Sequence, residues 1–170
     1  MNTVKILNTT ISETSLAEVS NILNDNNSLK VAICNTNTVV RSYRDKSLCN
    51  IINSFNIKTP DGFPIAKSSS ILYKNGQQRV DGYNVFLSTI SDGLSKNTSH
   101  YFYGSEDLVM KKLIQNLKKD FPNINIVGSF SPPVGSYEEL AEEEYVKYIL
   151  DTKPDIVWVS LGFPKQELFI

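Results

Sequence analysis

Short β-rich runs alternate with segments of helical periodicity along this chain, and this alternation constrains the fold more than any other feature of the sequence. Such runs lie at 4–7, 29–34, 100–103, 124–127 and 155–161. Most are followed by a polar or glycine-containing turn and then by apolar residues spaced three or four apart, as on one face of a helix. Strands that alternate with helices in this way form βαβ units.

The sequence therefore predicts an α/β fold of the Rossmann-like kind, a mostly parallel sheet with helices on both faces. The last four runs should lie parallel in one sheet. Ser15 and Glu18 stand as in a capping box and predict a helix over 15–25. Pro164 suits the first turn of a last helix. No linker or internal repeat divides the chain, so we expect a single domain over 1–170.

Composition and missing motifs exclude several classes of function. With 17 basic and 18 acidic residues the chain lacks a cationic field, so we expect no nucleic-acid partner. Neither a GxGxxG after the first strand nor a GxxxxGK[ST] is present, which disfavours redox dinucleotides and P-loop hydrolysis.

His100 is the only histidine and lies inside a strand-like run, so we interpret it as structural. Cys34 and Cys49 fit two buried, reduced thiols of a cytosolic protein. With no signal peptide and no long apolar run, the sequence predicts a protein that is neither exported nor membrane-spanning.

Polar or glycine residues follow the strand-like runs directly at four places. These are Asn35, Gly104, Gly128 and Gly162. In open parallel sheets, ligands bind outside the carboxyl ends of the strands, where glycine lets a diphosphate approach the backbone. Any one of the three glycines could equally be part of an ordinary strand-to-helix turn, but four such residues at equivalent places favour a ligand-binding edge.

Three further side chains are candidates for chemistry, each with a plainer alternative. Asp61, before Gly62, stands between the short run NIK and a probable helix, where the pair could simply form an Asp-Gly turn. Arg79 could pair with a phosphate or be a surface charge. Gln166 lies in the first turn of the predicted last helix, where its amide could contact a sugar hydroxyl or only solvent.

Taken together, six segments resemble the WecG/TagA/CpsF family of bacterial glycosyltransferases, glycosyltransferase family 26. They run in the family's order across nearly the whole chain: NTNTVV at 35–40, TPDGFPIAK at 59–67, RVDGYNVF at 79–86, YFYGSED at 101–107, IVGSFSPP at 126–133 and DIVWVSLGFPKQE at 155–167.

The resemblance implies an inverting transfer without metal or other cofactor. A sugar such as N-acetylmannosamine or another hexose would move from a UDP-sugar to a polyprenyl-diphosphate-linked saccharide, in surface-polysaccharide or teichoic acid synthesis. The enzyme would be cytoplasmic and peripheral at the inner face of the membrane. Whether it forms a homo-oligomer is left open.

The resemblance also implies roles for single residues. Asp61 matches the family's proposed general base. Asn35 and Gln166 match polar active-site residues, and Arg79 matches an arginine that contacts substrate. The glycines at 104, 128 and 162 would belong to the nucleotide-binding edge.

Two departures from the family pattern bear on function. Ile33 stands where many relatives have a threonine, which removes one hydrogen bond to substrate. The family continues past PKQE with a basic, partly apolar tail that engages the membrane, whereas this chain stops at Ile170 within a predicted helix. We therefore expect a C-terminally truncated sequence. The alternative function is a truncated or degenerate UDP-sugar-binding module without turnover.

Overall fold

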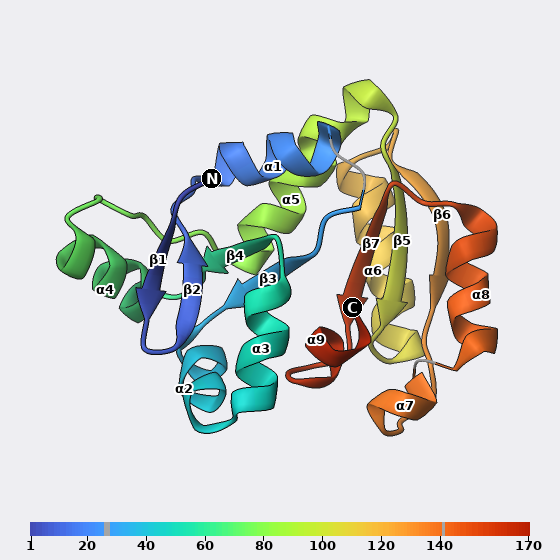
Figure 1. Cartoon of the computed structure of the whole chain (residues 1–170). Helices are drawn as coiled ribbons and strands as arrows, with labels where there is room; N and C mark the ends of the chain where they lie inside the picture. The colour runs from blue at the N-terminus through green and yellow to red at the C-terminus, as the bar shows by residue number, and fades with distance from the viewer. Residues whose placement is uncertain (26–27, 141) are drawn as a thin grey trace. The chain divides into compact units, whose positions relative to one another are not determined.

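A computed structural model describes residues 1–25, 28–140 and 142–170 of the chain. The chain divides into two units, Met1–Thr89 and Ile90–Ile170, each of which is described below by itself (Figure 1). The expectation of a single domain stays a prediction.

The first unit contains an antiparallel hairpin and a parallel strand pair. The hairpin consists of β1 (Thr3–Ile6) and β2 (Thr9–Ser12), and the parallel pair consists of β3 (Val31–Cys34) and β4 (Ile57–Pro60). Its helices are α1 (Leu16–Asp25), α2 (Thr36–Arg44), α3 (Lys46–Ser54), α4 (Phe63–Tyr73) and the start of α5 (Gly82–Gly93).

Local sequence signals explain where α1 begins and why it packs. The Ser15 hydroxyl accepts a hydrogen bond from the Glu18 backbone N–H at 3.2 Å, which is one half of the predicted capping box. The Glu18 carboxylate accepts instead from the Thr14 hydroxyl at 3.0 Å. Apolar residues of α1 pack on a core formed by Val19, Ile57, Val80 and Val85. This core lies beneath the two chain segments that carry Asp61 and Arg79, since Ile57 and Val80 belong to those segments.

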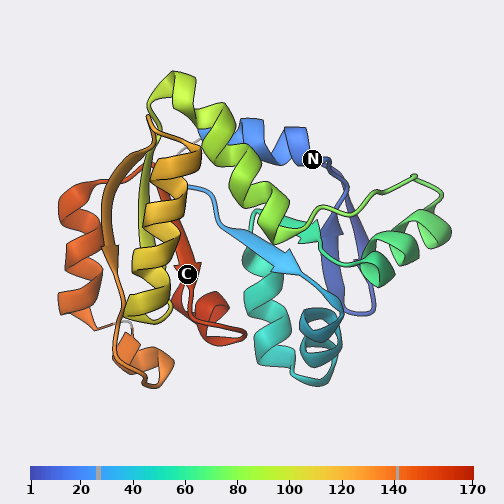
Figure 2. The same cartoon turned by 180° about the vertical axis from the view of Figure 1, so that it is seen from behind.

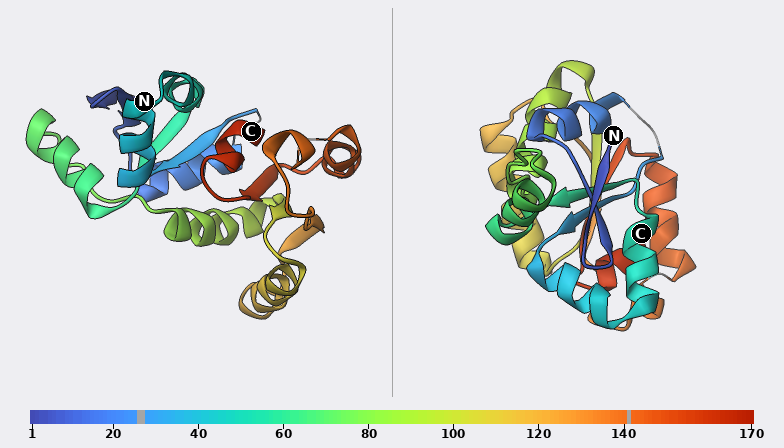
Figure 3. Two further views of the ribbon diagram at one scale, coloured as in Figure 1. Left: turned by 90° about the horizontal axis from the view of Figure 1, so that it is seen from below. Right: turned by 60° about the vertical axis from the view of Figure 1, so that its left-hand side comes forward.

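The second unit has a three-stranded parallel sheet in the order β6-β5-β7 (Figure 2). The strands are β5 (Ser99–Gly104), β6 (Asn125–Phe130) and β7 (Ile156–Ser160). The 3-10 helix η1 (Leu94–Lys96) precedes them, and the helices are α6 (Asp107–Asp120), α7 (Tyr137–Leu140), α8 (Glu143–Thr152) and α9 (Lys165–Phe169). Helices α6 and α8 lie on opposite faces of this sheet (Figure 3). The unit is therefore the three-layer α/β arrangement that the alternating pattern predicted.

Aromatic packing ties α9 to this sheet. The Tyr103 ring, fully buried on β5, stacks on Phe169 with ring centroids 4.7 Å apart. The Tyr103 hydroxyl donates to the Leu140 carbonyl at 2.5 Å. His100 is buried on the same strand, where its Nδ1 accepts a hydrogen bond from Trp158 Nε1 at 3.3 Å. The structural interpretation of His100 is confirmed.

The strand arrangement corrects one expectation. Three of the four runs, at 100–103, 124–127 and 155–161, share one parallel sheet, as predicted. The run at 29–34 does not pair with them among the described residues, because β3 pairs with β4 in a separate sheet. The β1–β2 hairpin was also missed, since the first run turns back at Leu7, whose φ is 53°. Among the described helices, none is long and apolar enough to cross a bilayer.

Candidate active site

Asn35 and Asp61 occupy equivalent places at the carboxyl ends of two neighbouring parallel strands. Cys34 on β3 is in register with Pro60 on β4, and the Asp61 backbone N–H donates to the Cys34 carbonyl at 3.1 Å. The residue after each strand therefore lies at the same edge of the sheet. Asn35 and Asp61 are therefore neighbours across these two strand ends.

Asn35 also begins a helix. Its Oδ1 accepts from the Thr38 backbone N–H at 3.1 Å and from the Thr38 hydroxyl at 3.4 Å, which makes it the N-cap of α2. This cap fixes the side chain in one orientation and uses its carbonyl oxygen. A contact to substrate would fall to the amide NH₂, which donates only.

Gly62 explains why Asp61 is presented at this edge. The glycine has a φ of 82°, a left-handed conformation that a residue with a Cβ rarely adopts, and α4 starts directly after it. Pro64 in the first turn of α4 needs no intrahelical hydrogen bond there. Asp61-Gly62 is thus a strand-to-helix turn, and the turn orients the carboxylate toward Arg79.

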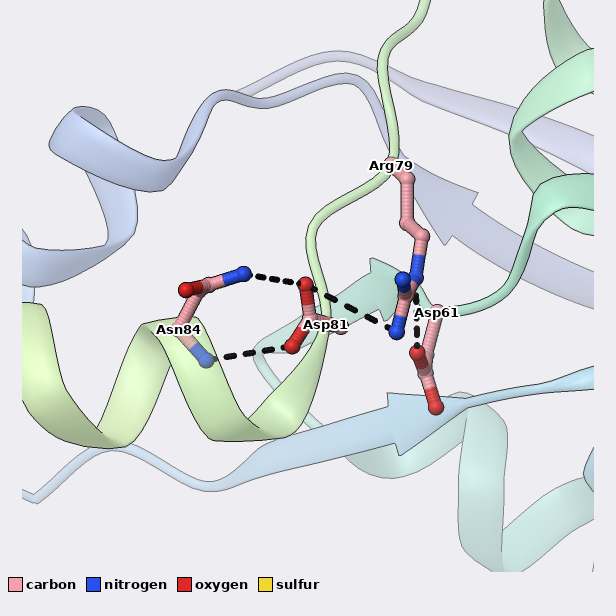
Figure 4. Close-up of polar contacts among 4 residues, drawn as sticks. All are labelled: Asp61, Arg79, Asp81 and Asn84. Atoms are coloured by element: carbon pink, nitrogen blue, oxygen red, sulfur yellow. Dashed lines mark hydrogen bonds and ion pairs between the residues drawn. The ribbon is translucent and has the colours of Figure 1, made fainter.

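Arg79 returns to the same edge after 17 intervening residues. The Val80 backbone N–H donates to the Pro60 carbonyl at 3.1 Å, which holds this segment against the end of β4. Arg79 Nε lies 3.6 Å from Asp61 Oδ1 (Figure 4). The Arg79 side chain is half-exposed. Arg79 is thus an exposed charge paired with a carboxylate, and its contact with a phosphate stays a prediction.

Asp81 is a second carboxylate beside Arg79 that sequence reasoning missed. Arg79 Nη2 lies 3.7 Å from Asp81 Oδ2. Asn84 fixes this carboxylate by donating its backbone N–H to Oδ1 at 3.1 Å and its side-chain Nδ2 to Oδ2 at 2.7 Å (Figure 4). The Asp-x-x-Asn spacing ahead of an apolar periodic stretch was the available signal, because an aspartate at that place is a preferred N-cap.

The surroundings of Asp81 keep it ionised. Burial acts to raise the pKa of this carboxyl, but the hydrogen bonds from Asn84 and the charge of Arg79 outweigh burial and lower the pKa below its ordinary value. Arg79 therefore contacts two carboxylates, those of Asp61 and Asp81, and the Asp81 carboxylate is rigidly fixed by its hydrogen bonds with Asn84.

The three candidate glycines of the second unit, at 104, 128 and 162, have different physical roles. Gly104 ends β5 with a φ of 107°, and a Cβ there would lie 2.3 Å from the Ser160 carbonyl oxygen, so close approach of β7 requires glycine. Gly162 follows β7 with a φ of 78° and has open space where a Cβ would point. Gly162 is therefore the glycine best placed to admit a ligand.

Gly128 departs from its predicted position. It lies within β6, which continues to Phe130, and not in a turn after a strand. A Cβ there would lie 2.5 Å from the Tyr101 ring. This glycine makes room for an aromatic side chain on the neighbouring strand. That Gly104, Gly128 and Gly162 bind a nucleotide stays a prediction.

The PKQE turn places polar groups after β7. Gln166 Nε2 donates to Glu167 Oε1 at 3.0 Å, and Lys165 Nζ donates to the Gly135 carbonyl at 2.6 Å. Glu167 is buried, and this burial raises its pKa. Gln166 belongs to the second unit, and its approach to Asp61 and Asn35 stays a prediction.

Two further observations bear on the expected chemistry. Ile33, the departure from the family pattern, lies against the start of α5, where its Cγ2 is 3.4 Å from the place of a Cβ on Gly82. In the part of the chain that the structure describes, no three His, Cys, Asp or Glu side chains gather as a metal site would require. The metal-independent reaction stays a prediction.

Comparison with known proteins bears on the family. The model of the glycosyl transferase WecG/TagA/CpsF family matches residues 3–170. The chain belongs to this family. It is 33% identical over 120 residues to an N-acetylglucosaminyldiphosphoundecaprenol N-acetyl-beta-D-mannosaminyltransferase of Bacillus spizizenii, covering 71% of this chain and 45% of the relative. Proteins of the same name in Bacillus subtilis and Staphylococcus aureus are 28% and 27% identical, over 82% and 85% of this chain and 53% and 55% of theirs. The chain thus spans about half the length of these relatives.

Proposed function

We propose that this protein is a glycosyltransferase that moves N-acetylmannosamine from a UDP-sugar to N-acetylglucosaminyl-diphosphoundecaprenol, in teichoic acid or related surface-polymer synthesis. The names of the family relatives support this acceptor and this sugar. The donor's UDP group, inversion at the anomeric carbon, independence of metal and a place at the inner membrane face are parts of the same proposal.

The observation that carries the proposal is the contact between Asp61 and Arg79 beside Asn35, at the carboxyl edge of β3 and β4. A transferase of this kind needs a base for the acceptor hydroxyl and positive charge for the departing diphosphate. A carboxylate and a guanidinium 3.6 Å apart place both within one substrate's reach.

In the proposed reaction the Asp61 carboxylate takes the proton of the acceptor hydroxyl. The hydroxyl oxygen forms a bond to the anomeric carbon of the donor sugar as the bond from that carbon to the diphosphate oxygen breaks. The bond electrons leave with UDP, and Arg79 stabilises the new charge. Attack from the side opposite the leaving group inverts the anomeric centre.

The second unit supplies the proposed nucleotide-binding edge. Backbone N–H groups near Gly162 and Gly104 would face the diphosphate, in the manner of strand-to-helix turns in open α/β sheets. The Gln166 amide would contact a sugar hydroxyl, and the Asn35 NH₂ would donate to the substrate.

The test is a transfer assay on the product of the complete reading frame. Purified protein is given UDP-N-acetylmannosamine and a short-chain N-acetylglucosaminyl-diphospholipid, and UDP release and the disaccharide-lipid are measured. We expect stoichiometric formation of both. Binding of UDP without turnover would instead support the alternative, a UDP-sugar-binding module.

A further inference from the structure

The proposed mechanism gives no task to Asp81, yet this carboxylate is the better fixed of the two that contact Arg79. Its side chain is 10% exposed, against 20% for Asp61. Two hydrogen bonds from Asn84 hold both of its oxygens. Asp81 is therefore a rigid anion in direct contact with a flexible cation.

The backbone of Asp81 is as firmly placed as its side chain. Its carbonyl accepts from the Val85 backbone N–H at 3.0 Å in the first turn of α5. Val80 and Val85, on either side, are buried in the core of the first unit. The anchor for Arg79 is thus attached to a packed helix and not to a mobile loop.

Arg79 needs such an anchor. A long side chain that is 55% exposed loses conformational entropy when it is held in one place, and a single exposed ion pair contributes little toward that cost. Here the two carboxylates contact different nitrogens, Nε and Nη2. When Asp61 gains a proton during transfer its attraction for Arg79 weakens, whereas the attraction of Asp81 is unchanged.

We propose that Asp81 is a positioning residue, which holds the Arg79 guanidinium beside Asp61 and the departing diphosphate throughout the reaction. The inference rests on the proposed function and adds a residue to its machinery. It acts through Arg79 and touches no substrate.

The variant Asp81→Asn removes the charge and keeps an oxygen able to cap α5, because asparagine is as good an N-cap as aspartate. Asp45→Asn is the matched control in the same unit. Asp45 caps α3 by accepting from the Ser47 and Leu48 backbone N–H groups, and it undergoes the same loss of charge away from Arg79.

Both changes are made in the wild-type protein and in Arg79→Ala. We expect Asp81→Asn to lower kcat/KM for the donor about tenfold in the wild type and less than about twofold in Arg79→Ala, because residues that act as a unit are not additive. Asp45→Asn should change kcat/KM less than about twofold in either background. An equal loss from Asp81→Asn in both backgrounds would overturn the proposal, since a purely structural defect does not need Arg79.

A second measurement does not depend on activity. The Nε–H resonance of Arg79, assigned by its absence in Arg79→Ala, should be dispersed and slow to exchange in the wild type and in Asp45→Asn, and should move toward the free-arginine position in Asp81→Asn. If the wild type transfers no sugar, the proposed function fails, and this resonance alone decides whether Asp81 positions Arg79. An identical resonance in the wild type and Asp81→Asn would refute that role.

Discussion

At the scale of single residues, Asp61 is defined by its neighbours. It follows a buried strand, precedes a glycine of positive φ and faces a guanidinium. The change Asp61→Asn keeps the size of the side chain and removes the proton acceptor. We expect turnover to fall by roughly 10²–10⁴-fold with UDP affinity nearly unchanged, as measured by steady-state kinetics and calorimetry. Near-full activity in this variant would rule out the base assignment.

Arg79 should respond differently from Asp61. Its proposed partner, the diphosphate, is already charged in the bound ground state, so Arg79→Ala should weaken donor binding as well as turnover. The expected result is a raised donor KM together with a lowered kcat. If only kcat changed, Arg79 would stabilise the transition state alone, and the proposed contact with the diphosphate of the bound donor would be wrong.

His100 should give the second unit a pH-dependent stability. Burial lowers its pKa from 6.5 to about 4, against a smaller opposing effect of Asp155. The unfolded chain therefore binds the proton first as the pH falls. Stability should decline from about pH 6.5 to about pH 4, by at most about 3 kcal/mol, and this contribution should level off below that.

Because His100 is the only histidine, this prediction can be isolated. Its ring resonances should titrate near pH 4 in the folded chain. His100→Asn removes the titrating group and offers an oxygen to Trp158, so it should flatten the decline across that window. An unchanged slope in His100→Asn would assign the effect to carboxyl groups instead.

At the scale of elements, two glycines at strand ends make opposite predictions. Gly104→Ala forces a Cβ against the backbone of β7 at a φ of 107°, and should destabilise by about 3–5 kcal/mol. Gly162→Ala meets no atom within 4 Å and carries only the strain of its φ of 78°, about 1–2 kcal/mol. Urea unfolding of both variants measures the difference, and equal midpoints would show that β5 and β7 can separate at low cost.

These glycines also show what the sequence could reveal at this scale. A glycine after an apolar run predicts a turn, and this prediction is correct for Gly162 and wrong for Gly128. The requirement at Gly128 is the width of the Tyr101 ring on another strand, a contact between residues far apart in the chain. Local patterns carry no information about such a neighbour.

At the scale of the whole molecule, the periodicity predicted the class of fold and most helices, because both follow from short-range alternation. It placed β5, β6 and β7 in one sheet correctly but wrongly added β3, because β3 and β5 have the same sequence pattern and differ only in their tertiary partners. In the same way Asp61 and Arg79 were found as motif residues. Asp81 could have been found as an N-cap, but its pairing with Arg79 is seen only in the structure.

The nucleotide should bind without divalent metal. Calorimetric titration of UDP into the complete protein should give the same affinity in EDTA and in magnesium to within about twofold, because Arg79 and backbone N–H groups would supply the positive charge. A strict requirement for magnesium or manganese would replace this picture with metal-assisted departure of UDP.

The segment between Asp61 and Arg79 leaves the sheet edge and comes back to it. The hydrogen bond from Val80 to Pro60 closes this excursion at its base. Tyr73 binds it to Lys5 of the hairpin, and Gln77 binds it to Thr14, which follows β2. Most of this excursion is helix α4, whose Ile65 and Ala66 are buried, and only the irregular stretch at 74–78 could be lengthened at low cost. Insertions or exchanges in that stretch would leave the Asp61 and Arg79 side chains in place. The excursion is thus a segment that evolution, or a protein engineer, could lengthen after α4 without moving the proposed base or its arginine.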